Sequence, residues 1–328
     1  MALEQGGSID VGAAAQPAAP PVLELDDLRL GFGGREVVRG LRLAVTPGQV
    51  YGLIGPSGGG KTTIVRAALG LLRPLGGEAR VFGQTAWALP AALRARLGYV
   101  PQHFGLYPNL TVGENLDCVS GLYGLGWWRR RRQIRAVLAT MELATHRRRL
   151  ARELSGGMQR RLQVAAALLH EPDLLLVDEP TAGLDPILRA RFWEGFRTMA
   201  AQGYTVFFTT QYVNEAEQCD RVALVAGGEL LAAGPPAELR REIFGGDVVD
   251  VVAPDLDWTA AGVLAGLPPV RRVEHVEPGR IRVVVEDAAR AAPVLVRALE
   301  QSGHRVESTA TQQPAFDEVF TRLVERHS

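Results

Sequence analysis

Short apolar runs alternate with segments of helical periodicity over residues 22–241. Runs that are mostly apolar, rather than apolar at alternate positions, are typical of strands buried on both faces of a parallel sheet. Three such runs predict core strands, at Val50–Ile54, Leu174–Val177 and Thr205–Thr209. The pattern therefore predicts an α/β domain with a largely parallel sheet. Near the end of this region, two apolar segments flank Gly227 and Gly228 and predict a β-hairpin.

The pattern changes after Gly245 and Gly246. It then predicts a strand at 247–253, a helix at 258–267, strands at 270–277 and 280–286, a helix at 287–302, a strand at 304–310 and a final helix over 316–325. Pro278 and Gly279, between the two middle strands, suit the centre of a type II turn. This βαββαβ order resembles a small ferredoxin-like α+β domain.

The predicted elements divide the chain into three parts. Residues 1–21 are rich in Gly, Ala and Pro without apolar periodicity, which predicts a flexible N-terminal segment. We expect the α/β domain over residues 22–241 and the small α+β domain over residues 242–328. A length of 328 residues allows an ordinary buried core in each of two domains.

Composition narrows the class of protein. The 36 basic and 36 acidic residues cancel, so no overall positive field would hold the chain on nucleic acid or on an anionic membrane, and any such contact must be local. We expect no nucleic-acid partner. Cys118 and Cys219 lie far apart and match no metal-ligand spacing, which excludes a structural zinc. No apolar run reaches the length of a membrane-spanning helix, and the first residues lack the order of a signal peptide. We therefore expect a cytoplasmic chain.

A glycine-rich loop follows the first predicted core strand. Residues 55–62 read G-x-x-x-x-G-K-[ST] between a strand and a helical pattern, which is the context that a phosphate-binding loop requires. Glycines let backbone N–H groups converge on phosphate oxygens, Lys61 reaches the β and γ phosphates, and Thr62 offers its hydroxyl to Mg²⁺. The alternative is a glycine-rich turn that includes a lysine by chance. Lys61 is the only lysine of the chain, which argues against that alternative. The predicted ATP-binding residues in this stretch are Gly55, Pro56, Ser57, Gly58, Gly59, Gly60, Lys61, Thr62 and Thr63.

Two acidic residues follow another predicted core strand. Asp178 and Glu179 come directly after Leu174–Val177, and carboxylates at the C-terminal end of a parallel strand lie where ligands bind in such sheets. In phosphoryl transfer the first acid would hold Mg²⁺, and the second would orient or deprotonate the attacking water. We therefore predict that Asp178 is a metal ligand and that Glu179 is catalytic.

A second glycine-containing segment opens a predicted helix upstream of these acids. It consists of Ser155, Gly156, Gly157, Met158 and Gln159. Ser155 suits the N-cap of the helix. The Ser and the two Gly leave backbone N–H groups uncovered, and a helix start of this kind binds anions readily.

These motifs resemble those of the ATP-binding subunit of an ATP-binding-cassette (ABC) transporter, over about residues 22–241. The loop at 55–62 resembles the Walker A motif, LSGGMQ at 154–159 the family signature, and LLLVDEP at 174–180 the Walker B strand. The resemblance adds Gln102 as a catalytic residue, the Q-loop glutamine, which contacts Mg²⁺ and senses the membrane partner. It also adds Asp185 in the D-loop and Phe32 as the aromatic that stacks on adenine. For Phe32 the alternative is a core position, since a lone aromatic beside a strand is often buried.

The resemblance implies a P-loop NTPase fold with a helical subdomain, ATP and Mg²⁺ as cofactors, and an ATP site shared by two cassettes. Ser155 and Gly157 of a second cassette would close over the γ phosphate that Lys61 of the first holds, so a homodimer or a paired cassette is implied. The cassette would drive separate transmembrane permease subunits from the inner face of the cell membrane. The C-terminal segment resembles the extension of drug-resistance-type exporter ATPases, which favours export of drugs, lipids or other hydrophobic compounds. The alternatives are a non-transport ABC ATPase and a weakly hydrolysing regulatory module.

One position departs from the family pattern. The family usually has a His, which contacts the γ phosphate, after the strand that follows Walker B, and this chain has Gln211 there. A Gln amide donates a hydrogen bond but cannot become a cation. We therefore expect slow but real hydrolysis, with Gln211 still in a catalytic position.

Arginines cluster between the Q-loop and the signature, at Arg129–Arg132, Arg135 and Arg147–Arg149. Such a run is usually a solvated helix face, because exposed charges are the default. The alternative is contact with anionic lipid headgroups or with an acidic membrane partner.

Overall fold

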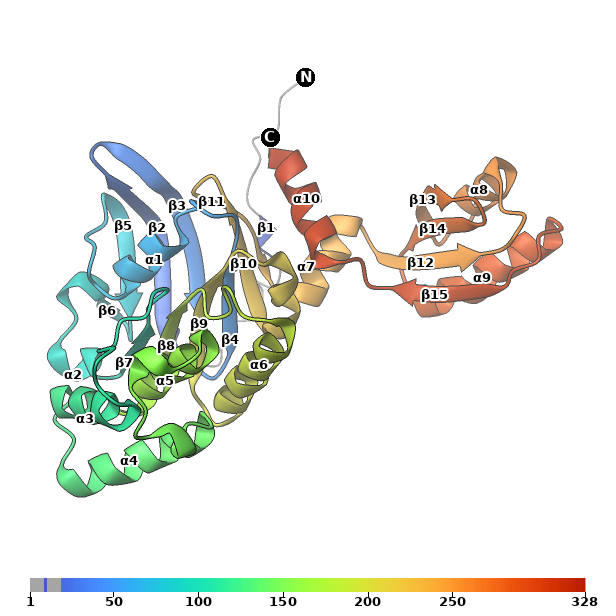
Figure 1. The fold of residues 1–328 in the computed structure, drawn as a ribbon. Helices are drawn as coiled ribbons and strands as arrows, with labels where there is room; N and C mark the ends of the chain where they lie inside the picture. Colours follow the sequence, from blue (N-terminus) through green and yellow to red (C-terminus); the bar gives the residue numbers. More distant parts are fainter. Residues whose placement is uncertain (1–8, 11–18, 328) are drawn as a thin grey trace. The chain divides into compact units, whose positions relative to one another are not determined.

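The structure is a computed structural model that describes residues 9–10 and 19–327 (Figure 1). The chain divides into two compact units, which meet in sequence between Ala233 and Gly234. Most of the segment expected to be flexible lies outside the described residues; within it, Ile9–Asp10 forms the short strand β1. The helix α7 (Pro236–Phe244) packs against α10 (Phe316–His327), so the contacts place α7 in the C-terminal unit. The sequence suggested a boundary at residue 241, after most of this helix.

A large sheet forms the centre of the first unit. Within the described residues it has seven strands in the order β1-β11-β10-β4-β9-β8-β7. After β1, these are β11 (Glu229–Gly234), β10 (Arg221–Ala226), β4 (Val50–Ile54), β9 (Thr205–Thr210), β8 (Leu174–Asp178) and β7 (Leu97–Val100). The strands from β10 to β7 pair in parallel. The three predicted core strands and the α/β fold are confirmed, and β10 and β11 lie side by side as the predicted hairpin.

This sheet separates two hydrophobic cores, which explains the apolar runs of its strands. On β8, Leu174 and Leu176 face one core, whereas Leu175 and Val177 face the other. The first core includes α1 (Lys61–Ala68), and the second includes α5 (Gly156–Leu168) and α6 (Pro186–Ala201). Full burial of each such side chain contributes about 1.5–3 kcal/mol. Packing on both faces fixes where the strands end, and hence where the loops that carry the predicted motifs begin.

A second, antiparallel sheet of the first unit was not predicted from the sequence. Its order is β3-β2-β5-β6, formed by β2 (Leu23–Phe32), β3 (Arg35–Val45), β5 (Gly76–Val81) and β6 (Gln84–Thr85). One face of β2 and β3 is buried in the same core as α1, and the other carries exposed residues. Strands of this half-buried kind give no long apolar run, so the core-strand pattern misses them.

A helical segment lies between β7 and β8. It contains α3 (Val112–Leu122), α4 (Trp127–Thr140) and α5, which pack on one another as the implied helical subdomain (Figure 1). The start of α3 is fixed by a reciprocal cap between Thr111 and Glu114. The other short helices of the unit are α2 (Ala91–Arg94) and the 3₁₀ turns Ala86–Ala88, Ala144–His146, Ala151–Glu153 and Val213–Gln218.

The C-terminal unit contains the predicted βαββαβ order. Its elements are β12 (Asp247–Val252), α8 (Trp258–Ala265), β13 (Val270–Glu277), β14 (Arg280–Val285), α9 (Ala288–Gln301) and β15 (Ser308–Gln312), followed by α10. The four strands form an antiparallel sheet in the order β13-β14-β12-β15. The last strand begins at Ser308 and not at residue 304, because its pairing with β12 starts where Ser308 meets Val252.

Candidate functional site

The glycine-rich loop connects β4 to α1 and closes around a lysine. Gly58 (φ 79°) and Gly60 (φ 86°) have left-handed backbone conformations, which residues with a Cβ rarely adopt. A Cβ on Gly60 would lie 2.7 Å from Cγ2 of Val38. The ammonium of Lys61 donates hydrogen bonds to the carbonyls of Gly55 (2.8 Å) and Pro56 (2.9 Å). The loop is therefore a backbone cradle with one cation at its base.

The environment of Lys61 fits a phosphate group. The side chain is buried, and its Nζ lies 4.0 Å from Oε1 of Glu179. Burial lowers the pKa of Lys61 below its usual value, and the charges of Glu179 and Asp178 oppose that shift. Apart from these acids, its ammonium is bonded to backbone carbonyls. A bound phosphate would supply the negative charge that a buried cation requires.

Asp178 fits a metal ligand. It is the last residue of β8 and is buried. One carboxylate oxygen accepts a hydrogen bond from the Thr209 hydroxyl, whereas Oδ2 is buried with no hydrogen-bond partner. An unpaired buried carboxylate oxygen is costly, and carboxylate oxygen is a ligand that Mg²⁺ prefers. The site thus has a free oxygen where the resemblance places the metal.

Glu179 lies between the lysine and the Q-loop glutamine. Its backbone is left-handed (φ 46°) and is held there by a hydrogen bond from its N–H to the carbonyl of Thr209 (3.0 Å). Oε2 accepts a hydrogen bond from Nε2 of Gln102 (2.7 Å), which follows β7. A left-handed non-glycine residue costs about 1–3 kcal/mol and is often found at functional sites. The structure therefore brings together Lys61, Asp178, Glu179 and Gln102.

Gln211 contacts the glycine-rich loop through Ser57. It follows β9, and its amide oxygen accepts a hydrogen bond from the Ser57 hydroxyl (2.6 Å). The position that departs from the family pattern is therefore part of the same cluster. Thr62 and Thr63 lie in the first turn of α1, directly after Lys61.

Three other predicted site residues or segments lie apart from this cluster. Ser155 caps α5 as predicted, accepting a hydrogen bond from the N–H of Met158 (3.4 Å), and is exposed. Among the described residues, no hydrogen bond or ion pair joins residues 155–159 to the loop at 55–62. Asp185 is exposed and caps α6 through the N–H of Leu188 (3.0 Å). Phe32 ends β2 and is 50% exposed, so it is not a core residue.

Arg160 is the residue that the sequence analysis missed. It lies in α5, directly after the signature segment, and is buried. Its guanidinium donates hydrogen bonds to carbonyls of the Walker B turn, at Asp178 (2.5 Å), Glu179 (2.6 Å) and Pro180 (3.1 Å). It also donates to the carbonyls of Pro101 and Gln102, in the Q-loop. One side chain therefore ties together the two segments that position Glu179 and Gln102.

Burial also affects the charge of Arg160. It lowers the pKa of the guanidinium to about 10, although the nearby Asp178 and Glu179 oppose the shift. The side chain stays cationic at neutral pH, because that value lies well above 7. No pattern in the sequence separates it from the adjacent Arg161, which pairs with the exposed Glu142 (2.7 Å).

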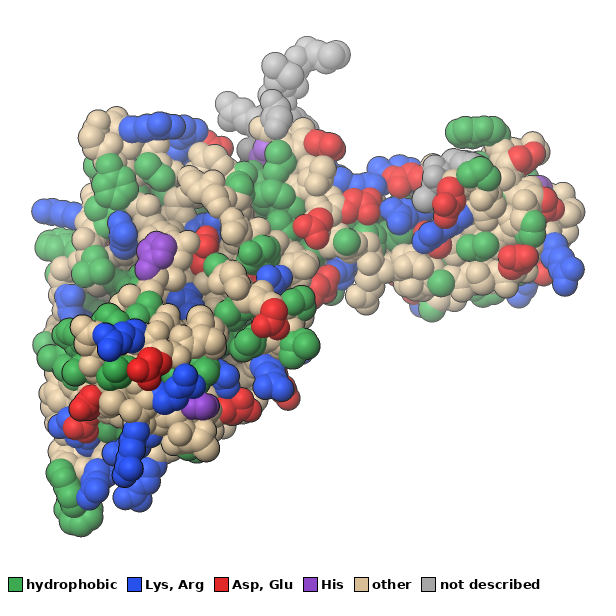
Figure 2. Space-filling model, in the orientation of Figure 1, with side chains coloured by type: hydrophobic (Ala, Val, Ile, Leu, Met, Phe, Trp, Pro, Cys, Tyr) green, Lys and Arg blue, Asp and Glu red, His purple; other side chains and the backbone are tan. Residues whose placement is uncertain are grey.

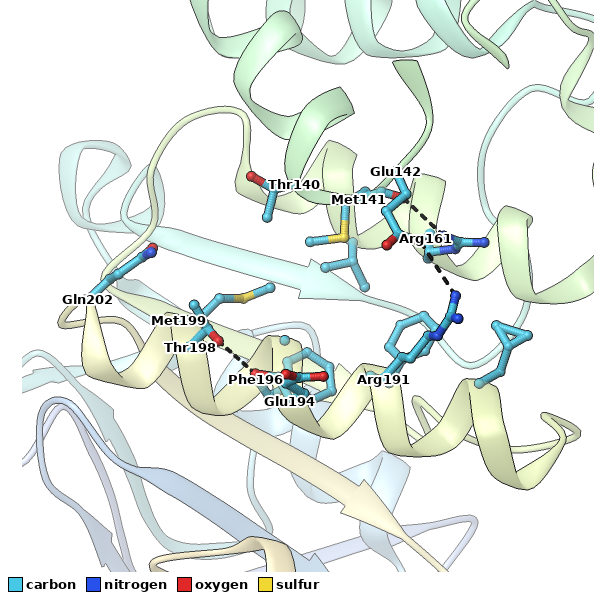
Figure 3. A pocket seen from close by; sticks show the side chains of 14 residues that line it. Thr140, Met141, Glu142, Arg161, Arg191, Glu194, Phe196, Thr198, Met199 and Gln202 are labelled. Carbon is cyan, nitrogen blue, oxygen red and sulfur yellow. Dashed lines mark hydrogen bonds and ion pairs between the residues drawn. The ribbon is translucent and has the colours of Figure 1, made fainter. Parts of the chain in front are cut away.

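A separate cavity of about 480 Å³ lies between α6 and the turn that follows α4 (Figure 3). Its walls include Phe192, Phe196 and Met199, and Glu142 forms ion pairs with Arg161 and Arg191 at its edge. None of the predicted site residues lines it. This cavity is therefore distinct from the Lys61 cluster.

Comparison with known proteins agrees with this geometry. The family model described as ABC transporter matches residues 38–182, and the model described as ATP-binding protein DrrA1-3-like, C-terminal domain, matches residues 234–324. The Daunorubicin resistance ATP-binding protein DrrA3 of Streptomyces coeruleorubidus is 38% identical, over 93% of this chain and 96% of its own length. The Nod factor export ATP-binding protein I of Cupriavidus pinatubonensis is 38% identical, over 94% of this chain and 93% of its own. A solved ATP-binding subunit of an ABC transporter is 28% identical, with a TM-score of 0.62, over 68% of this chain and 93% of its own.

The fold and the cluster define a P-loop ATPase. The chain belongs to the ABC transporter family, as one of its ATP-binding subunits, and has a DrrA-like C-terminal domain. It binds ATP and couples ATP hydrolysis to transport. In the part of the chain that the structure describes, no helix is both long enough and apolar enough to cross a membrane.

Proposed function

We propose that this chain is the ATP-hydrolysing subunit of an exporter for drug-like or other hydrophobic compounds, and that the Lys61 cluster is its catalytic site. The observation that carries the proposal is the chain of contacts from Lys61 through Glu179 to Gln102, at the carboxyl ends of β8 and β7. The names of the relatives support export, since they include a drug-resistance protein and a Nod factor exporter subunit. Their similarity extends through the C-terminal domain.

Nucleotide binding is assigned to the loop at 55–63. Its backbone N–H groups would surround the phosphates, and Lys61 would pair with the β and γ phosphates. Phe32, which is half exposed, would stack on the adenine ring. Asp178, Thr62 and Gln102 would hold Mg²⁺, which supplies charge neutralisation of the phosphates when bound.

Hydrolysis is assigned to Glu179. Its carboxylate is oriented by Gln102 and by the strained backbone at φ 46°, which fixes the direction in which the side chain leaves the strand. A carboxylate so placed accepts a proton from the attacking water. Gln211, through its bond to Ser57, would hold the loop from the opposite side and stabilise the γ phosphate by donation from its amide.

A second cassette would complete the site. Ser155 and Gly157 lie at the start of α5, and among the described residues no hydrogen bond or ion pair joins residues 155–159 to the phosphate loop of the same chain. A helix N-terminus favours an anion. ATP bound to one cassette would therefore be closed over by residues 155–159 of another, either a second copy or a paralogue, with Asp185 in the D-loop beside the interface.

A membrane permease would dock beside the Q-loop. A groove of about 170 Å³ there is lined by Tyr99, Pro101, Gly105, Leu106, Val119 and Tyr123, among others. An apolar, aromatic groove of this size suits the end of an amphipathic helix. Movement of Gln102 would then pass between the groove and Glu179, and the chain would lie peripherally on the inner face of the membrane.

The test compares Glu179→Gln with Glu229→Gln, a surface substitution of the same kind at a residue paired with Arg39. The Glu179→Gln variant should bind ATP normally and lose Mg²⁺-dependent hydrolysis by about 10²–10⁴-fold, because an amide cannot accept the proton. Its ATP-bound form should be a dimer by light scattering, whereas Ser155→Arg should bind ATP and stay monomeric. Near-normal hydrolysis by Glu179→Gln would reject the site. A monomeric ATP-bound Glu179→Gln variant, with its permease present, would reject the shared site.

A further inference from the structure

Two tryptophans and four arginines form an exposed patch at the start of α4. This aromatic–arginine patch consists of Trp127, Trp128 and Arg129–Arg132, directly after the N-cap Gly126. Trp127 is 55% exposed and Trp128 is 80% exposed. Figure 2 shows hydrophobic and basic side chains together at this end of the helical segment. Exposed apolar groups that cluster, unlike single ones, mark interaction surfaces.

The patch does not contribute to the core of its own unit. The buried residues of α4 are Gln133, Ile134, Val137 and Leu138, all after the patch. The indoles pack on each other instead, with ring centroids 4.3 Å apart and planes at 82°. The guanidinium of Arg131 lies 4.7 Å from the Trp127 ring, a cation–π contact. Folding therefore leaves both indoles available to an external surface.

The patch also carries excess positive charge, although the whole chain is neutral. Arg129 pairs with Glu171 and Arg130 with Asp117, each at 2.7 Å. Arg131 and Arg132 have no ion pair among the described residues, and the first turn of α4 contains no acidic residue. Arg131 and Arg132 are both exposed, so their charges face solvent.

We propose that the aromatic–arginine patch binds the surface of a membrane that contains anionic lipids. Indoles are favoured at the headgroup level of a bilayer, where the ring is apolar and the N–H is hydrated. Guanidinium groups pair with phosphate oxygens in two parallel hydrogen bonds. A headgroup layer adapts to a protruding patch, whereas a folded partner would need a matching concave site. None of the residues placed in the ATP site belongs to the patch, so this inference does not depend on the proposed catalytic roles.

The test is cosedimentation of the full chain with phosphatidylcholine vesicles, with and without phosphatidylglycerol. We expect binding only to the vesicles that contain phosphatidylglycerol, and weaker binding as salt rises. Each arginine near an anionic surface contributes roughly a factor of five in affinity, so Arg131→Gln with Arg132→Gln should weaken binding about 25-fold. Trp127→Ala with Trp128→Ala should abolish it.

The chain offers a matched control. Arg73 lies over the ring of Trp87 at 4.6 Å, and that indole is 47% exposed, so the pair has the same chemistry elsewhere in the unit. Arg73→Gln with Trp87→Ala should bind vesicles like the unchanged chain. ATP hydrolysis should be equal in all these variants, which shows that they are folded.

Three results would overturn the proposal: no binding to phosphatidylglycerol vesicles, unchanged binding by both patch variants, and an equal loss of binding by the control. If the unchanged chain binds no vesicles and the patch variants lose a co-purifying membrane protein, the patch is assigned to a protein partner. A failure of any of these kinds would leave the Glu179→Gln experiment unaffected.

Discussion

Arg160 provides the sharpest test of how the site is held together. Substitution by Met keeps the length of the side chain and removes every donor. The carbonyls of Asp178, Glu179, Pro180, Pro101 and Gln102 would then lose the hydrogen bonds that Arg160 donates. An unsatisfied buried acceptor costs about 1–3 kcal/mol. Relaxation and the removal of a buried cation offset part of that cost.

We expect Arg160→Met to lower the free energy of unfolding by about 3–5 kcal/mol, since several buried carbonyls lose their donor at about 1–3 kcal/mol each and relaxation offsets part of the sum. For a unit of this size that corresponds to a fall in Tm of about 6–20 °C. The remaining folded protein should hydrolyse ATP at least 100-fold more slowly, since a displacement of about 1 Å at a catalytic group has that effect. Its affinity for ATP should change little, because among the described residues Arg160 has no hydrogen bond or ion pair with the loop at 55–62.

The matched control is Arg161→Met, one residue along the same helix. The Arg161 side chain is 22% exposed and pairs with the exposed Glu142, and an ion pair open to solvent contributes about 0–1 kcal/mol. The measurements are calorimetric unfolding, kcat and ATP affinity, all made below the Tm of each variant. Equal stability of the two variants would show that the Arg160 contacts carry no net energy. A destabilised Arg160→Met protein with normal kcat would show that those contacts do not position Glu179.

Three further predictions concern the loop and its neighbours. Burial lowers the pKa of Lys61, and pairing with a phosphate should raise it again, so Lys61 should take up a proton when ATP binds at a pH between these two values. Calorimetry in buffers of different ionisation enthalpy measures this uptake, and no uptake at any alkaline pH would refute the prediction. Gly60→Ala should weaken ATP binding by more than tenfold without unfolding the chain. The φ of 86° costs about 1–2 kcal/mol for alanine, and the new Cβ would meet Val38. Fluorescence titration with a nucleotide analogue tests this prediction, and a normal affinity would contradict it. Gln211→His should raise kcat with little change in nucleotide Kd, because an imidazole can accept the Ser57 hydrogen bond and also hold a proton. A histidine variant with a lower kcat than the unchanged chain would show that the site requires the Gln211 amide.

The sequence by itself determined the elements whose burial is uniform. The predicted limits of β4 and β8 agree with the structure to within one residue, because a strand covered on both faces must be apolar throughout. The sequence also predicts the loop at 55–62, since only glycines tolerate its left-handed positions and the single lysine follows them. It does not predict the antiparallel sheet built on β2 and β3, because the sequence pattern of a strand with alternating burial resembles that of many exposed segments.

Tertiary structure alone decided which distant residues meet. Arg160 and Arg161 are identical in type and adjacent in sequence, yet one is buried among carbonyls of the Q-loop and Walker B turn and the other pairs with a surface glutamate. The same holds for Ser57 and Gln211, which are 154 residues apart and share a hydrogen bond. Local patterns record whether a position is buried, but a hydrogen bond depends on the register of β4, β8 and β9 and on the packing of α5 against them. Those long-range placements are set by the sum of many apolar contacts, so no short stretch of sequence encodes them.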